Sequence, residues 1–275
     1  MQGGIFMKFK IGFQGYEEEK EELLQTAEQE ENIAVRSVVQ VHFPDRGRAY
    51  AYYNDKFDLH KGDAVFVEGK LEGVRGIVTE VSRSFRIRLS DYKRVIAVAD
   101  TDVKGELYFG GSHLLAFDER VIPYEKIRTW YLPPESDDEI AVGSDDEGFF
   151  LARLEFFRIR PDVAERGFDY YNFNKVVYLS VNGTSGRAIV QGSQAYEVSF
   201  DFIDGEIRNL TCGCWCSYHC KHEYAVLLQL RDILEIIDEN YGEQYEQSGY
   251  FAAVSKSELL SYSLRGNESG KIALY

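Results

Sequence analysis

All four cysteines of the chain lie within nine consecutive positions, in the stretch NLTCGCWCSYHCKHEYAVLLQL (residues 209–230), together with two of the five histidines. The candidate ligands there are Cys212, Cys214, Cys216, His219, Cys220 and His222. Thiolates and an imidazole are ligands that zinc prefers, and a structural zinc site takes four of them in a tetrahedron. The composition of the stretch therefore predicts a zinc site with three cysteines and one histidine.

Two other uses of the cysteines fit this spacing less well. Disulfide bonds between cysteines two residues apart would close very small, strained loops, and a reducing cytosol disfavours them. Free thiols that pack as small apolar side chains have no reason to gather in nine positions. A zinc ion with four protein ligands has no open position for a reactive water, so the site is expected to be structural and not catalytic.

A pair of strands and a helix are expected to position these residues. Residues 196–202 alternate apolar and polar side chains, which predicts a strand, and Asp204-Gly205 is a hairpin signal before a return strand. After His222, apolar residues recur at helical spacing as far as Ile237. The unit is therefore strand, strand, metal knuckle and helix. The metal is expected to hold together a unit too small to fold on its own core.

The spacing leaves two ligand sets open. Cys212 is expected just after the return strand, and Cys220 and His222 in the first turn of the helix. Residues two apart in an extended chain point to the same side. This brings Cys212 and Cys214 to one metal ion, and it would do the same for Cys214 and Cys216.

The arrangement resembles a known family. A Cys-x-Cys pair, a short gap and a Cys-x-His that opens an apolar helix (CKHEYAVLLQL) resemble the SWIM zinc finger. The upstream segment GRAIVQGSQAYEVSFDFIDGEI, with its Gly192-Ser193 turn and Tyr196, resembles the strand pair of that family, so the resemblance covers residues 168–237. It implies one zinc ion per chain, with Cys216 as a surplus thiol and His219 as a spare ligand. The implied ligands are Cys212, Cys214, Cys220 and His222.

Short strands are predicted between residues 38 and 81. Four segments there are rich in Val, Tyr and Phe and are separated by turn residues: VVQVHF, AYAYYN, DAVFVEG and VRGIVTEV. Evenly spaced short strands predict a small antiparallel barrel. The order of the pieces resembles the small N-terminal β-barrel of primosomal replication-restart helicases over residues 36–98. This resemblance implies no catalytic residues.

The stretch SRSFRIRLSDYKR (residues 82–94) is locally basic, with one acidic residue, Asp91. Its cations and rings are Arg83, Arg86, Arg88, Lys93 and Arg94, with Phe85 and Tyr92. Cations for phosphates and aromatic rings for bases are what single-stranded nucleic acid requires, so the stretch is a candidate nucleic-acid site. The alternative is a barrel edge that charge protects from pairing.

A strand at this position would limit base stacking. Arg86 and Arg88 would share one face, and Phe85 and Ile87 would share the other and face the core. Tyr92 would then be the ring left for stacking. Binding is therefore expected to be weak and mostly electrostatic.

The bulk composition predicts a folded cytoplasmic protein. With 44% hydrophobic and 14% aromatic residues, the chain can bury a core. The formal net charge of −15 argues against nucleic acid bound over the whole surface. No apolar run approaches the roughly 20 residues that cross a bilayer, and MQGGIFMKFKIGF does not look like a secretory signal.

The predicted fold class is α+β, a small antiparallel β-barrel domain followed by a ββα SWIM-like zinc domain. The expected segments are an acidic N-terminal segment (1–35), the barrel with a strand-rich connector (36–132), an acidic linker (133–148), the zinc domain (149–240) and a strand-containing tail (241–275). The tail is expected to form a further small sheet. His113 and Trp130, in the connector, are interpreted as packing residues.

Sequence signatures of enzymes are missing. The chain has no phosphate-binding loop and no Gly-x-Ser-x-Gly motif, and the acidic pairs at 137–138 and 145–146 lack EF-hand spacing. The predicted function is a non-enzymatic zinc-binding module that contacts nucleic acid or DNA-processing machinery, with any motor supplied by a partner protein. The competing prediction is a protein-interaction adaptor. It is favoured by the near balance of acids and bases between residues 201 and 231.

Overall fold

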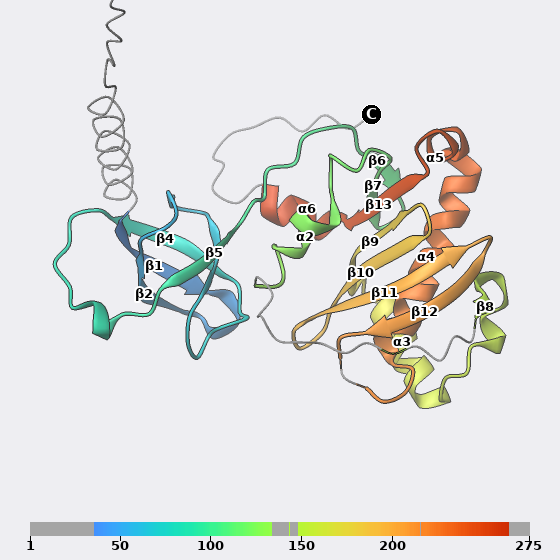
Figure 1. Cartoon of the computed structure of the whole chain (residues 1–275), viewed down its shortest axis with the longest axis horizontal. Coiled ribbons are helices and arrows are strands. Elements are labelled where there is room, and N and C mark those ends of the chain that lie inside the picture. Colours follow the sequence, from blue (N-terminus) through green and yellow to red (C-terminus); the bar gives the residue numbers. More distant parts are fainter. Residues whose placement is uncertain (1–35, 134–142, 144–147, 215, 264–275) are drawn as a thin grey trace, which may run out of the picture.

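The protein folds around two antiparallel β-sheets, one of five strands and one of eight (Figure 1). The computed structural model describes residues 36–133, 143, 148–214 and 216–263. Helices accompany the larger sheet, so the predicted mixture of helices with antiparallel sheets is confirmed. The acidic segment 1–35 and the acidic pairs at 137–138 and 145–146 lie outside the described residues.

The smaller sheet is formed by the segments rich in Val, Tyr and Phe. Its strands are β1 (Ser37–Phe43), β2 (Arg48–Asn54), β3 (Ala64–Val67), β4 (Gly76–Ser82) and β5 (Val95–Ala99), in the order β2-β1-β4-β3-β5. Every second residue of β1 is buried, as in a strand with one face on a core. Two 3₁₀ turns accompany these strands, η1 (Pro44–Arg46) and η2 (Leu89–Asp91). The core of this sheet includes Val39, Val41, Phe43, Val65 and Val78.

The expected barrel is not closed by a continuous hydrogen-bond ladder. The edge strands β2 and β5 approach each other at one isolated bridge, between Tyr53 and Arg94. There the backbone N–H of Tyr53 donates to the carbonyl of Lys93 at 2.9 Å. A register shift between Gln40 and Val41 interrupts the β1–β4 ladder, and such irregularities bend a strand. The sheet is thus an open one whose two edges meet at a single point.

The larger sheet brings together strands from distant parts of the chain. Its strands are β6 (Tyr108–Gly110), β7 (His113–Ala116), β8 (Phe149–Phe150), β9 (Val176–Asn182), β10 (Ser185–Gln191), β11 (Ala195–Ile203), β12 (Glu206–Cys212) and β13 (Tyr250–Ser255). The order across the sheet is β6-β7-β13-β9-β10-β11-β12-β8. The strand-rich connector, predicted as the last part of residues 36–132, therefore contributes β6 and β7 to this sheet.

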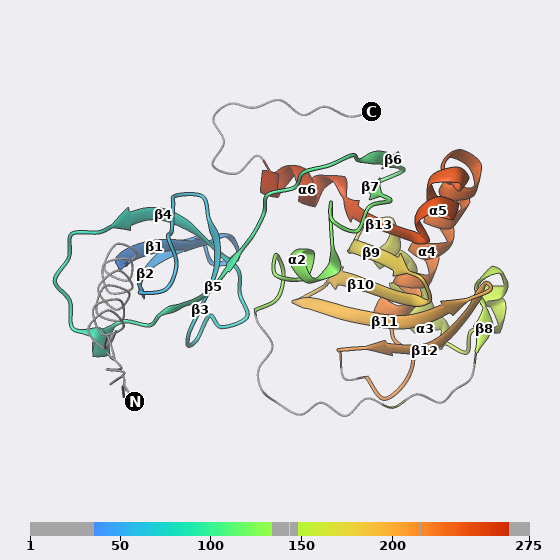
Figure 2. The ribbon, with the colours of Figure 1, turned by 45° about the horizontal axis from the view of Figure 1, so that its top comes forward.

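Helices cover parts of both faces of the larger sheet (Figures 1 and 2). They are α2 (Tyr124–Arg128), α3 (Pro161–Asn172), α4 (Lys221–Asn240), α5 (Gly242–Ser248) and α6 (Lys256–Ser263), with the 3₁₀ segment η3 (Leu151–Phe156). One apolar core lies under α4, which contacts β9 to β12 and packs against α3. A second core lies on the other face, with residues of α2 and α6.

The strand β13 lies inside the larger sheet and does not start a sheet of its own. It pairs with β7 on one side and with β9 on the other. All six of its residues are buried, because each face of the sheet carries an apolar core at this point. The first strand-like part of the tail, where a further small sheet was expected, therefore belongs to the main sheet, whereas residues 264–275 lie outside the described residues.

The helix α4 does not depend on a metal alone. Its apolar side chains recur at helical spacing and are buried in the core under the sheet, among them Val226, Leu230, Ile233 and Ile237. Burying such a side chain stabilises a fold by about 1.5–3 kcal/mol. The strands and helix around the cysteines therefore share a large core with β9, β10 and β13, and the metal is not the only support of this unit.

Trp130 links the two sheets. It is fully buried, and its ring stacks on Tyr262 of α6 with centroids 4.6 Å apart. The indole N–H donates to the carbonyl of Asp100, just after β5, at 2.7 Å. Its own carbonyl accepts from Arg75, between β3 and β4, at 3.0 Å. Trp130 is thus a packing residue, as predicted, and so is His113, which is buried between Ser112 and the Val176 carbonyl.

Candidate metal centre

The first cysteine is positioned by a tight hairpin. Strands β11 and β12 are joined by Asp204 and Gly205, which both have positive φ angles (51° and 83°). Two positive φ angles make the turn compatible with the right-handed twist of the flanking strands, and glycine adopts them readily. The predicted Asp204-Gly205 turn is confirmed. At the far end of β12, Cys212 pairs with Val198 of β11.

The last two ligand candidates are positioned by the start of α4. Cys220 is the N-cap residue of the helix, and His222 lies in its first turn. The cap is a reciprocal one, because the N–H of Glu223 donates to Cys220 Sγ at 3.4 Å and the Glu223 carboxylate accepts from the Cys220 N–H at 2.8 Å. The predicted helix after the knuckle is therefore present, and its first turn aims two side chains toward β12.

These elements bring four potential ligands together. One ligand atom from each of Cys212, Cys214, Cys220 and His222 lies within 4.8 Å of the other three. The cluster is sheltered, since Cys220 and His222 are buried and the other two cysteines are half-buried. Three thiols and one imidazole at this separation can hold a metal ion. Because the tetrahedron would be complete, the group supplies a closed site with no position for a reactive water.

The two remaining candidates lie outside this group. Cys216 is exposed, and it is not part of the four-residue cluster. The ring of His219 packs on Phe157 at 4.4 Å between centroids, and its Nδ1 lies 3.1 Å from the Glu223 carboxylate. Of the two ligand sets that the spacing left open, the geometry gathers the one with Cys212.

The imidazole of His222 fits the metal site. Its Nδ1 lies 3.7 Å from Cys212 Sγ, a separation that one ion bound to both atoms would bridge. The ring is held by Tyr196, which stacks on it at 4.3 Å, and by Tyr170, tilted at 5.3 Å. Its Nε2 is buried and has no hydrogen-bond partner among the described residues. The ring orientation is therefore set by aromatic packing, with Nδ1 toward the thiols.

The thiols perturb one another electrostatically. A hydrogen bond with Cys212 lowers the pKa of the Cys220 thiol to about 4, and the same hydrogen bond, with burial, raises the pKa of Cys212. Burial raises the pKa of Cys214 to about 12. Without a metal ion, the cluster therefore favours one deprotonated cysteine, Cys220, and opposes deprotonation of Cys212 and Cys214. A divalent cation reverses that preference because it binds each thiolate directly.

The basic stretch is a loop and not a strand. Strand β4 ends at Ser82, and residues 83–94 lead through the short turn η2 to β5. The expectation that Arg86 and Arg88 share a strand face is therefore wrong. The Phe85 side chain is 37% exposed, with its ring edge on Tyr53, so it does not face the core with Ile87.

Two of the five cations in this loop are already paired. Arg83 donates to Asp58 at 2.8 Å, and Arg94 bonds Asp55 while its guanidinium lies over the Tyr53 ring at 5.4 Å. Arg86, Arg88 and Lys93 have no side-chain hydrogen bond or ion pair with another described residue. Tyr92 is half-buried. The structure thus leaves three cations and a partly exposed Phe85 for a ligand.

Sequence reasoning missed Glu223. It is the one acidic side chain that is buried among the described residues, with 6% exposure, and burial raises the pKa of its carboxyl group. A signal was present, because Cys220-x-x-Glu223 repeats the Ser/Thr-x-x-Glu pattern of a capping box with a thiol in place of the hydroxyl.

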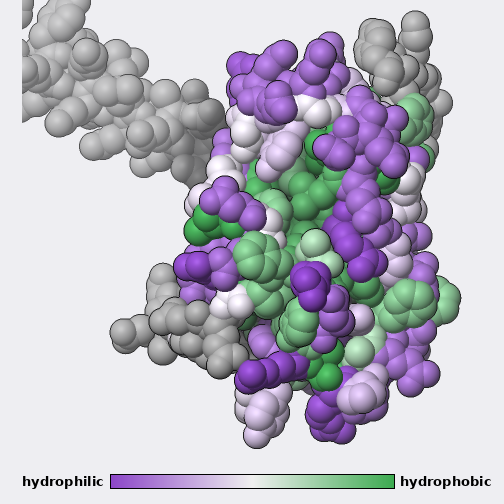
Figure 3. All heavy atoms as spheres, turned by 90° about the vertical axis from the view of Figure 1, so that its right-hand side faces the viewer, coloured by the Kyte–Doolittle hydropathy of each residue, from purple (hydrophilic) through white to green (hydrophobic). Residues whose placement is uncertain are grey.

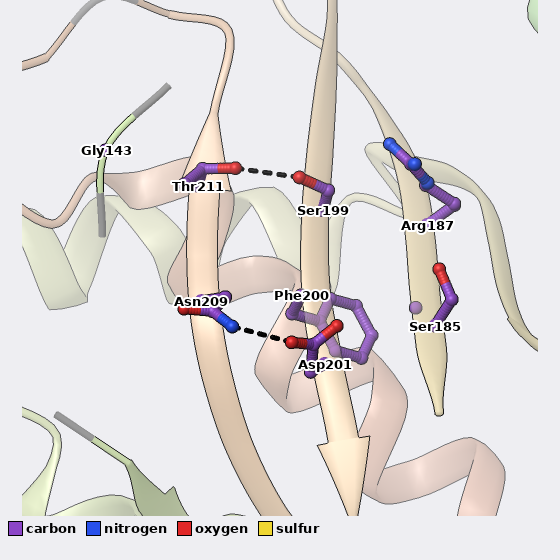
Figure 4. Close-up of a pocket in the computed structure, with 9 residues that line it drawn as sticks. Gly143, Ser185, Arg187, Ser199, Phe200, Asp201, Asn209 and Thr211 are labelled. Atoms are coloured by element: carbon purple, nitrogen blue, oxygen red, sulfur yellow. Dashed lines mark hydrogen bonds between the residues drawn. The ribbon is translucent and has the colours of Figure 1, made fainter. Parts of the chain in front are cut away.

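The face of β10, β11 and β12 that lies opposite α4 carries a shallow polar hollow of about 330 Å³ (Figure 4). Cross-strand hydrogen bonds join Ser199 to Thr211 at 2.7 Å and Asn209 to Asp201 at 2.6 Å. These four side chains satisfy one another, whereas Ser185 and Arg187 also line the hollow and make no hydrogen bond with the other residues drawn in Figure 4.

Apolar side chains gather on the end of the molecule that carries α5 and β8, where they form a stripe between hydrophilic flanks (Figure 3). Between residues 150 and 218 of the sequence, four aromatic residues are largely exposed: Phe150 (57%), Phe156 (61%), Phe173 (72%) and Tyr218 (86%). Exposed apolar surface of this kind is typical of contact sites for other molecules.

Comparisons with protein-family models, with curated proteins and with solved structures gave no match for this chain. In the part of the chain that the structure describes, no helix is both long enough and apolar enough to cross a membrane. The functional assignment therefore depends on the geometry of the cysteine and histidine cluster.

Proposed function

We propose that this protein is a zinc-binding module of the SWIM type with no catalytic activity of its own. One observation carries the proposal: the ligand atoms of Cys212, Cys214, Cys220 and His222 lie within 4.8 Å of one another. Sulfur and imidazole ligands in this ratio favour zinc over calcium or magnesium, which take oxygen ligands. When bound, the ion supplies a cross-link between the end of β12 and the start of α4.

The proposal predicts one zinc ion per chain. Elemental analysis of the purified protein should find zinc close to equimolar, and mass spectrometry under denaturing conditions should find four free thiols. Zinc binding requires deprotonated thiols. Titration of metal-free protein should therefore release protons as zinc is added. A protein purified without metal that also fails to take up zinc, or a stable disulfide within the knuckle, would contradict the proposal.

The partner we propose is nucleic acid or DNA-processing machinery, contacted through the loop at residues 83–94. It is supported by Arg86, Arg88 and Lys93, which are free to contact phosphates, whereas Arg83 and Arg94 are paired with carboxylates. Binding should be weak and mostly electrostatic because the whole chain carries a net charge of −15.

This partner can be tested by salt dependence. Three phosphate contacts on a single strand should give a slope of about −2 when the logarithm of affinity is plotted against the logarithm of salt concentration. Arg86→Glu combined with Arg88→Glu should abolish binding. The matched control is Arg46→Glu combined with Arg48→Glu, which changes the net charge equally on two exposed residues outside the loop. Equal loss in both double variants would mean that only the total charge matters.

A protein-interaction adaptor is the second candidate, favoured by the exposed Phe150, Phe156, Phe173 and Tyr218 side chains. In this case zinc has a purely structural role. The adaptor should show no measurable nucleic-acid binding even at low salt, and capture of its protein partner should survive reversal of Arg86 and Arg88. Tight nucleic-acid binding that resists salt would contradict both candidates.

A further inference from the structure

Glu223 is buried beside the four clustered ligand candidates. Its polar contacts go to His219 and Cys220, where the loop between β12 and α4 ends. Its carboxylate accepts a hydrogen bond from the Cys220 N–H at 2.8 Å and lies 3.1 Å from His219 Nδ1. Its own N–H donates to Cys220 Sγ at 3.4 Å. Burying a carboxylate is costly unless polar partners offset the loss of water. The usual role of an acidic side chain, which is to keep a surface soluble, therefore does not explain a carboxylate buried at this position.

The loop end is also held from its other side. The His219 ring packs on Phe157, with centroids 4.4 Å apart, and the Phe157 ring stacks parallel to Tyr224 of α4. His219 is thus fixed between an aromatic ring and the Glu223 carboxylate. It acts on the neighbouring Cys220 through Glu223 and is not one of the four clustered ligand candidates.

Helix capping alone is the simpler explanation for these contacts. A capping box stabilises a helix start by about 1 kcal/mol, usually with a serine or threonine at the N-cap. Here the N-cap residue is Cys220, and its Sγ belongs to the four-atom cluster. The same hydrogen bonds that cap the helix therefore also set the direction of a metal ligand.

We propose that Glu223 is a positioning residue for the metal: it holds Cys220, and with His219 it clamps the loop end so that the thiolate stays aimed at the ion. This inference rests on the proposed zinc site. A metal ion leaves such a site by losing its ligands one after another. A ligand held in place recaptures the ion before the next one detaches, so the clamp slows metal loss. Changes in residues that hold metal ligands typically cost 10–100-fold in metal affinity.

The test uses the full chain loaded with zinc or with cobalt(II), and measures metal dissociation into an excess of chelator. Glu223→Ala should still bind one metal ion per chain but lose it about 10–100-fold faster. Its cobalt spectrum should shift in the thiolate charge-transfer bands, because the geometry at one sulfur changes. Glu223→Gln keeps an oxygen that accepts from the Cys220 N–H, so it should restore most of the slow release.

Controls separate positioning from stability. Glu239→Ala removes an exposed carboxylate from the same helix and should leave the dissociation rate unchanged. His219→Ala is the second variant in case Glu223→Ala fails to fold, and it should accelerate release by a smaller factor. If Glu223→Ala only lowers thermal stability, with an unchanged dissociation rate and cobalt spectrum, Glu223 is a cap and the inference is overturned. The inference is also overturned if Glu223→Gln releases the metal as fast as Glu223→Ala does.

The inference and the proposed function fail in different ways. Wild-type protein that takes up no metal ends both. If the wild-type protein holds one metal ion tightly and the Glu223→Ala variant releases it at the same rate, only the proposed role of Glu223 is overturned.

Discussion

Cys220→Ser and His222→Ala are each expected to abolish tight zinc binding. Either change leaves three ligands from the group of four that the fold brings together. Three thiolates without the imidazole, or two with it, cannot close the tetrahedron of a structural site. Elemental analysis should find the variants nearly free of zinc after dialysis against a weak chelator.

The structural damage should be local. Zinc contributes on the order of 10 kcal/mol in fingers that have no other core, but α4 also packs on the larger sheet through Val226, Leu230 and Ile233. We therefore expect a smaller loss of stability. Hydrogen exchange should accelerate at the end of β12, in residues 213–219 and in the first turn of α4, while the amides of β9 and β13 stay protected.

Cys216→Ser is the matched control, because it removes an exposed thiol from the same loop. It should retain one zinc ion and wild-type exchange rates. If Cys216→Ser releases zinc while Cys212→Ser keeps it, the ligand set is the alternative one, with Cys214 and Cys216. Global unfolding of Cys220→Ser would show that the core under α4 contributes less than its burial indicates.

Trp130→Ala should be among the most destabilising single changes away from the metal. Removing a fully buried tryptophan typically costs about 3–5 kcal/mol, and this one also loses its stacking on Tyr262 and its hydrogen bond to Asp100. In a chain of this size the melting temperature should fall on the order of 10 °C. Thermal unfolding of the zinc-loaded protein, followed by circular dichroism, measures the change.

Two variants show which property of Trp130 matters. Trp130→Phe keeps a ring against Tyr262 but leaves the Asp100 carbonyl without its donor, which should cost about 1–3 kcal/mol. Tyr218→Ala removes a side chain that is 86% exposed and should change stability by less than about 0.5 kcal/mol. If Trp130→Ala melts within a degree or two of the wild type, the link between the sheets contributes little.

The candidate site was predictable because its determinants are close together in the sequence. Cys212 and Cys214 follow a strand, Cys220 and His222 open a helix, and the Asp204-Gly205 turn fixes the hairpin before them. Each of these follows from local periodicity or turn chemistry. The choice between Cys212 and Cys216 did not follow, since residues two apart are equivalent in an extended chain and only the fold separates them.

The larger sheet was less predictable because its pairings join distant segments. Nothing local indicates that residues 113–116 pair with residues 252–255, or that this pair lies next to β9. The loop at 83–94 was mistaken for a strand because Phe85, Arg86, Ile87 and Arg88 alternate in polarity, although the chain makes no ladder there. The buried role of Glu223 likewise depends on packing that spacing does not encode.

The central position of β13 has a consequence for how the chain is made. Strands β7 and β9 are separated by β13, which comes about 70 residues after β9 ends. During synthesis the ribosome releases β7 and β9 long before their common neighbour, so two edges with unpaired backbone groups must wait for it. Closure of the sheet must therefore wait until β13 has been made, and it is dominated by non-local pairing, which slows folding. A nascent chain that stalls before residue 250 would expose the unpaired edges of β7 and β9 and would depend on chaperones to avoid aggregation.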